Sequence, residues 1–201
     1  MDEQYFTDSS PATADEVRTI EVSARGFDLS MGVSSRVFSG SKLDLGTRQL
    51  LEIAPDLPEG GTFLDLGCGW GPIATIMSLE SPNAAVWAVD VNSRAVDLTQ
   101  RNAQSNGASG VRALKAEEAL AASRESDTRF DVIWSNPPVR IGKDEMLLAW
   151  LGRIAPTGVA YLVVQRNLGA DSLITWLNGQ GLQASKYASK KGFRIIEVRP
   201  A

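Results

Sequence analysis

Hydrophobic residues in the second two thirds of the chain form short runs that alternate with amphipathic segments. Five apolar runs predict strands at residues 62–66, 85–89, 111–114, 130–134 and 159–164. Between them, helical periodicity predicts helices near residues 72–80, 93–105, 117–123, 143–153 and 170–179. Short buried strands separated by helices are typical of βαβ units, so we expect a Rossmann-like α/β fold with a mainly parallel sheet and helices on both faces.

The two ends of the chain depart from this alternation. Runs 182–186 and 194–198 leave no room for a helix between them, so they predict a C-terminal antiparallel hairpin that completes a seven-stranded sheet. Residues 19–22 and 27–31 alternate around Arg25-Gly26 and predict an N-terminal β-hairpin. Residues 44–54 predict a helix that Asp44 caps and Pro55 ends.

The length of 201 residues suits one domain. We expect a flexible arm at residues 1–16, which are polar and contain Pro11, and a single domain at 17–201. Within that domain, residues 17–57 form an appendage and residues 60–201 the core. No apolar run approaches the roughly 18 residues that cross a bilayer, and the acidic N-terminus lacks a signal-peptide pattern, so we expect no membrane partner.

The scarcity of cysteine and histidine excludes several chemistries. Cys68 is the single cysteine and histidine is absent, which rules out an internal disulfide, Ser-His-Asp catalysis and histidine-ligated metal. A zinc site is not expected, and no other metal cofactor is predicted. A lone cysteine fits the reducing cytoplasm, which is the expected location.

Charge is distributed unevenly along an acidic protein. Residues 1–139 hold 11 Lys/Arg and 20 Asp/Glu, a net of −9, whereas residues 140–201 hold 9 and 4, a net of +5; together they give −4. A basic third can present a local patch to an anionic partner, or it can be scattered, solvated charge. The oligomeric state is not readable from the sequence, and a monomer is the default expectation.

The most informative segment is residues 63–71, Phe-Leu-Asp-Leu-Gly-Cys-Gly-Trp-Gly, followed by Pro72. An apolar strand ends beside an acid, three alternating glycines follow, and a helix begins, which is where open α/β sheets bind nucleotides. A dinucleotide fold requires G-x-G-x-x-G, but here the glycines fall as G-x-G-x-G. Asp65 would repel a pyrophosphate and suits a cationic ligand such as the ammonium of a methionine moiety.

Acids also follow the next two predicted strands. Asp90 lies 25 residues after Asp65, where a carboxylate can accept both ribose hydroxyls or can cap the next helix. Glu117, with Glu118 as the alternative, lies where an adenine amino group would be; either could instead interact with a helix dipole.

The fourth strand ends in Asn136, Pro137 and Pro138, which are the predicted catalytic residues. Two prolines stiffen the backbone and remove donors. Asn136 adds a side-chain carbonyl acceptor. Fixed acceptors of this kind would bind the N–H groups of an amine and aim its lone pair at an electrophile, so catalysis by orientation needs no histidine.

Three acids after three successive strands resemble the S-adenosylmethionine site of class I methyltransferases, over residues 60–165. The resemblance implies that adenosylmethionine binds along the carboxyl edge of the sheet and leaves as S-adenosylhomocysteine. The implied cofactor-binding residues are Thr47, Asp65, Gly67, Cys68, Gly69, Gly71, Asp90, Val91, Ala116, Glu117 and Asn136.

Asn-Pro-Pro followed by a hydrophobic residue resembles the amino-methyltransferase signature of adenine, guanine and protein-glutamine methyltransferases. Many members carry an aromatic residue after the second proline, which stacks on the target. This chain has Val139 there, so Phe38, Trp70 or Trp134 is expected to replace that aromatic.

Residues 32–39, 43–47, 135–143 and 163–166 resemble the "methyltransferase small" domain of RsmC-like 16S ribosomal RNA guanine-N2 methyltransferases, over residues 17–198. The resemblance implies guanine N2 methylation of ribosomal RNA or of an assembled small subunit. Another amino-methyltransferase, acting on protein glutamine, a different base or a small molecule, is the alternative, and a non-catalytic binding protein is a further one. The implied substrate contacts are Phe38, Val139, Arg140, Lys143 and Arg166.

Overall fold

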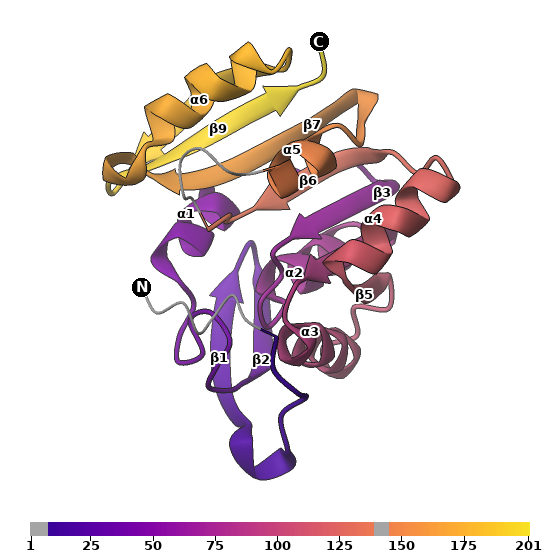
Figure 1. Cartoon of the computed structure of the whole chain (residues 1–201). Coiled ribbons are helices and arrows are strands. Elements are labelled where there is room, and N and C mark those ends of the chain that lie inside the picture. Colours follow the sequence, from indigo (N-terminus) through magenta and orange to yellow (C-terminus); the bar gives the residue numbers. More distant parts are fainter. Residues whose placement is uncertain (1–7, 139–144) are drawn as a thin grey trace.

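A seven-stranded sheet in the order β5-β4-β3-β6-β7-β9-β8 forms the centre of the computed structural model, which describes residues 8–138 and 145–201 (Figure 1). Five strands pair in parallel, and β9 pairs antiparallel with both β7 and β8, which confirms the predicted mainly parallel sheet with a C-terminal hairpin. The strands are β3 (Gly60–Leu66), β4 (Asn83–Asp90), β5 (Val111–Lys115), β6 (Phe130–Ser135), β7 (Ile154–Gln165), β8 (Gln183–Lys190) and β9 (Phe193–Arg199).

Helices cover both faces of this sheet, as predicted, because strand residues alternate between two hydrophobic cores. Phe63, Val132 and Trp134 face one core, which also takes residues from α1 (Leu45–Ile53), α2 (Pro72–Glu80) and α3 (Ser93–Ser105). Leu64 and Ile133 face the other, which takes residues from α4 (Ala116–Glu125), α5 (Glu145–Leu151) and α6 (Ala170–Gly179).

The direction of strand progression reverses next to β3. From β3 the chain moves outward to β4 and β5, then returns to β6 on the other side of β3. Ligands of open α/β sheets bind at such a switch point, outside the carboxyl ends of the strands. The ends of β3 and β6, Leu66 and Ser135, are paired neighbours, and the Ser135 hydroxyl donates to the Leu66 carbonyl at 2.7 Å.

The N-terminal appendage contains the antiparallel pair β1 (Arg18–Ala24) and β2 (Phe27–Val33). Strand β2 is fixed to helix α3 by two asparagines. Asn102 accepts from the Gly32 amide at 2.7 Å and donates to the Gly32 carbonyl at 2.8 Å, and Asn106 makes the same pair with Ser30. The β1–β2 hairpin therefore lies beside α3, and residues 34–44 lead the chain from the hairpin to α1 (Figure 1).

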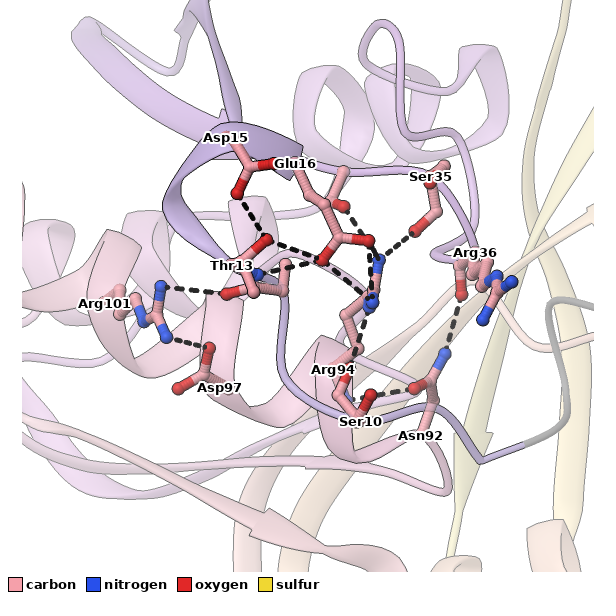
Figure 2. A network of polar contacts seen from close by, with 12 residues as sticks. Ser10, Thr13, Asp15, Glu16, Ser35, Arg36, Asn92, Arg94, Asp97 and Arg101 are labelled. Atoms are coloured by element: carbon pink, nitrogen blue, oxygen red, sulfur yellow. Dashed lines mark hydrogen bonds and ion pairs between the residues drawn. The ribbon is translucent and has the colours of Figure 1, made fainter.

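Residues 8–16 differ from the expected flexible arm, because they are bonded to the start of α3 (Figure 2). The buried Arg94 guanidinium donates to the Ser10 carbonyl and pairs with the Glu16 carboxylate at 3.2 Å. Glu16 belongs to the 3-10 helix η2 (Ala14–Glu16), whose capping box with Thr13 closes the segment. This arrangement cannot be predicted from the sequence, because the polar residues of the segment contact their hydrogen-bonding partners only in the folded chain.

Candidate active site

The turn after β3 holds its glycines in conformations that other residues rarely adopt. Gly67 and Gly69 have φ values of +77° and +57°, and no atom lies within 4 Å of where a Cβ would be. Their conformation therefore requires glycine, and the space above their backbone is open to a ligand. Helix α2 begins immediately afterwards at Pro72, in the favoured first position.

Asp65 lies fully buried in β3, just before this turn. Its Oδ2 accepts the Ala74 amide at 2.9 Å, while its Oδ1 is buried without a hydrogen-bond partner in the described part of the chain. Burial raises the pKa of Asp65 to about 8, and the Asp90 charge adds to the shift. An unpartnered buried carboxylate oxygen is costly, and a cation at this position would compensate it.

Asp90 ends β4 and fixes the glycine turn from the side. One carboxylate oxygen accepts the Gly69 amide at 3.0 Å, and the other accepts the Asn92 amide at 2.9 Å. Burial raises its pKa, whereas hydrogen bonds from backbone amides oppose the rise. The cap of α3 is Asn92, which accepts from Arg94, so Asp90 is not needed for that role.

Asn136 follows β6 and is held by the N-terminus of α1. Its Nδ2 donates to Asp44 Oδ2 at 2.8 Å and to Thr47 Oγ1 at 3.1 Å. Asp44 Oδ2 also accepts the Thr47 amide at 3.0 Å, so Asp44 caps α1 as expected. The contact between this carboxylate and Asn136 is not apparent from the sequence, because the two residues are 92 positions apart.

The glycine turn, Asn136 and the start of α1 line one pocket, of about 350 Å³ including space open to solvent. The predicted cofactor residues Asp65, Gly71 and Asp90 are not among its lining residues. Its floor comes from the glycine turn and the start of α2, namely Gly67, Cys68, Gly69, Trp70, Pro72 and Ile73. Its other walls are Phe38, Ser39, Leu43, Asp44, Thr47 and Asn136. The pocket thus unites the glycine segment with Asn136, two predicted motifs that are far apart in sequence.

The pocket also discriminates between the aromatic candidates. Phe38 is half-buried and lines the wall. Trp70 lines the floor, but it is 2% exposed and its Nε1 donates to the Ser39 carbonyl at 3.2 Å. Trp134 is 1% exposed in the core beneath Arg25, so it is wrong as a stacking candidate. Of the three aromatic candidates, Phe38 is the one that lines the pocket with a partly exposed side chain.

Cys68 lines the floor as a buried thiol. It is 4% exposed, and burial raises its pKa well above the usual range, with the Asp90 and Asp65 charges adding to the effect. A neutral buried thiol is a poor nucleophile, so Cys68 is not a candidate for covalent catalysis.

Other predicted residues lie outside this pocket. Val91 is 42% exposed after β4, Ala116 is buried at the start of α4, and Glu117 is exposed in its first turn. Arg166 is exposed in the 3-10 helix η3 (Arg166–Leu168), which follows β7. Of the remaining predicted substrate contacts, Val139, Arg140 and Lys143 lie outside the described residues.

Within residues 8–138 and 145–201, no group of three or more cysteine or acidic side chains is arranged to hold a metal ion. Over the same residues, no helix has the length and apolar character that crossing a membrane requires.

Known proteins resemble the chain along most of its length. The family described as Methyltransferase small domain matches residues 28–197. The uncharacterized protein YbxB of Bacillus subtilis is 30% identical over 202 residues, 99% of each protein. Ribosomal RNA small subunit methyltransferase C of Chromohalobacter salexigens is 33% identical over 174 residues, 81% of this chain and 49% of that protein.

A solved structure shares the fold. The 16S ribosomal RNA N2 methyltransferase RsmC of T. thermophilus, in complex with AdoMet and guanosine, superposes with a TM-score of 0.76 at 23% identity, covering 95% of this chain and 52% of that one. The chain thus spans nearly all of YbxB and about half of the two named methyltransferases. The matched segment includes both the glycine turn and Asn136, and the chain belongs to the methyltransferase small domain family.

Proposed function

We propose that this protein transfers a methyl group from S-adenosylmethionine to an exocyclic amino nitrogen, N2 of a guanine in ribosomal RNA. The observation that carries the proposal is the shared pocket of the glycine turn and Asn136. A donor seated on the turn and an amine held by Asn136 would then meet in one pocket, which supports transfer by proximity and orientation.

Three features fit the cofactor. The open space above Gly67 and Gly69 admits a ligand against the backbone. The unpartnered Oδ1 of Asp65 suits the ammonium of the methionine moiety, and the Asp90 carboxylate suits ribose hydroxyls. When bound, S-adenosylmethionine supplies an electrophilic methyl group on a cationic sulfur. Ala116 and Glu117 stay predicted contacts of the adenine.

Asn136 performs the chemical part of the proposal by orientation. Its Nδ2 is occupied by Asp44 and Thr47, so its Oδ1 is the atom left to accept an N–H from the target amine. When Oδ1 accepts this hydrogen bond, the lone pair of the target nitrogen points away from the amide and towards the methyl donor. The new nitrogen–carbon bond forms as the sulfur–carbon bond breaks, and the extra proton leaves the nitrogen to solvent, so no basic side chain is required.

Phe38 is the proposed stacking partner of the base. It is half-exposed on the pocket wall, and aromatic rings stack on bases that have left a duplex.

The contacts of Arg140, Lys143 and Arg166 with RNA phosphates stay predictions. We propose a cytoplasmic location, which action on ribosomal RNA and a single free cysteine support.

Incubation with tritiated S-adenosylmethionine tests this function. Total RNA, small ribosomal subunits and protein extract should be supplied in parallel, with nucleoside analysis of any labelled RNA. We expect label in N2-methylguanosine from ribosomal RNA or the subunit. Label confined to protein, or to a different nucleoside, would contradict the proposed substrate.

A further inference from the structure

One carboxylate joins the start of α1 to the proposed catalytic amide. Asp44 Oδ2 accepts both the Thr47 amide at 3.0 Å and Asn136 Nδ2 at 2.8 Å. Asn136 is 92 positions from Asp44 and 89 from Thr47, so its contacts with them are a product of the tertiary fold rather than of local sequence. Thr47 adds its hydroxyl as a second acceptor at 3.1 Å, which places both amide hydrogens of Asn136 beside acceptors.

The chemistry of Asp44 fixes which end of the Asn136 amide faces the pocket. The oxygen and nitrogen ends of an amide have nearly the same size, so sterics alone permit a 180° flip. A carboxylate accepts hydrogen bonds and cannot donate them, and therefore only the NH₂ end can face Asp44. A flipped amide would place two oxygens together at Asp44 and would turn an NH₂ group towards the donor hydrogens of the target amine.

The backbone of α1 packs closely against the Asp44 and Asn136 side chains and restricts their movement. A Cβ added at Gly46 would lie 3.0 Å from Asp44 Oδ2, 3.0 Å from the Phe193 ring and 3.4 Å from Asn136 Nδ2. The helix backbone thus approaches both side chains as closely as a glycine allows. A negative charge at the NH₂ end also polarises the amide and strengthens Oδ1 as an acceptor.

We propose that Asp44 is a positioning residue for methyl transfer: it orients the Asn136 amide so that Oδ1 accepts from the target. This inference rests on the proposed function for its catalytic meaning. Asp44 then has two roles. It caps α1, which any good capping residue can do, and it orients Asn136, which requires a carboxylate of this length.

Substitutions can separate these two roles. Asp44→Ser retains a cap for α1 but is too short to reach Asn136. We expect its melting temperature to stay near wild type and its kcat to fall roughly 10- to 100-fold, since small misplacements of reacting groups cost about that much. Asp44→Asn retains the cap and one oxygen acceptor but not the charge, and should lose about fivefold. Asp28→Ser removes an equivalent carboxylate from the exposed hairpin and should turn over like wild type.

A double-mutant cycle identifies how Asp44 acts. If it acts through the amide, Asp44→Ser should cause no further loss of turnover in an Asn136→Ala background, whereas equal losses in both backgrounds would overturn the proposal. Wild-type turnover by Asp44→Ser would overturn it too. Should that variant fold too poorly to assay, Asp44→Asn decides: a wild-type rate overturns the proposal and a fivefold loss supports it.

The orientation can also be tested without turnover. The side-chain amide protons of Asn136 should move upfield in the NMR spectrum of Asp44→Ser, because they lose a charged acceptor; unchanged resonances would overturn the inference. If the wild-type protein transfers no methyl group, the proposed function fails, and the spectrum still tests the contact between Asp44 and Asn136.

Discussion

Asp65→Asn tests whether the buried Asp65 carboxylate serves to bind a cationic ligand. Asparagine preserves an oxygen for the Ala74 amide and removes the ionisable group. In the native protein, burial raises the pKa of Asp65 from 3.8 to about 8. Between these values the folded state holds a proton that the unfolded state releases, so wild-type stability falls as pH rises from about 4 to 8.

The magnitude follows from the shift. Each pKa unit corresponds to about 1.36 kcal/mol, so the rise to about 8 amounts to roughly 5 to 6 kcal/mol at pH 8 and above. The asparagine variant escapes this cost. At about 2 to 4 °C per kcal/mol for a domain of this size, its melting temperature at pH 8 should exceed that of wild type by roughly 10 °C or more. The difference should shrink steadily towards pH 4.

Thermal unfolding from pH 4 to pH 9, with and without S-adenosylmethionine, is the assay. The cofactor should raise the wild-type melting temperature at pH 8 and have little effect on Asp65→Asn, because the variant offers no charge to the ammonium group. A difference in melting temperature that does not vary with pH, or a variant less stable than wild type at pH 8, would refute the reasoning about Asp65.

Three further substitutions test Asp90, Phe38 and Gly46. Asp90→Ala should weaken cofactor binding at least about tenfold in calorimetry, since two hydrogen bonds to ribose are lost; an unchanged dissociation constant would remove the ribose assignment. Phe38→Leu should lower kcat/KM for RNA roughly 5- to 100-fold while Phe38→Tyr should not, since base stacking contributes about 1 to 3 kcal/mol; equal rates for the two variants would exclude stacking. Gly46→Ala should lower turnover by crowding Asp44 and Asn136; unchanged turnover would show that these side chains can move aside.

The fold could be predicted from the sequence because its buried strands are short apolar runs with clear interruptions. Even so, β7 extends over Ile154–Gln165, well beyond the apolar run at 159–164. Its additional residues include Pro156, which does not read as strand, and the pairing with β6 shifts register between Phe130 and Val132 to accommodate them. Hydrophobic pattern alone does not reveal such an irregularity.

The site was less predictable, because its contacts join residues that are distant in sequence. The glycine turn and Asn136 were recognisable as local motifs, each with its own chemistry. Asp44 was recognisable only as a helix cap, since its contact with Asn136 exists only after α1 packs beside the end of β6. The choice of Phe38 over Trp134 likewise required the structure, because only the structure shows that Phe38 is half-buried on the pocket wall and Trp134 is buried in the core.

The central claim is that Asn136 delivers an amine to a donor bound on the glycine turn. Single-turnover methyl transfer by Asn136→Ala, with cofactor affinity measured on the same preparation, tests it most directly. We predict a rate at least about 100-fold below wild type with an unchanged dissociation constant for S-adenosylmethionine, as expected when one orienting hydrogen bond at the reacting centre is removed. Transfer at the wild-type rate would contradict the account.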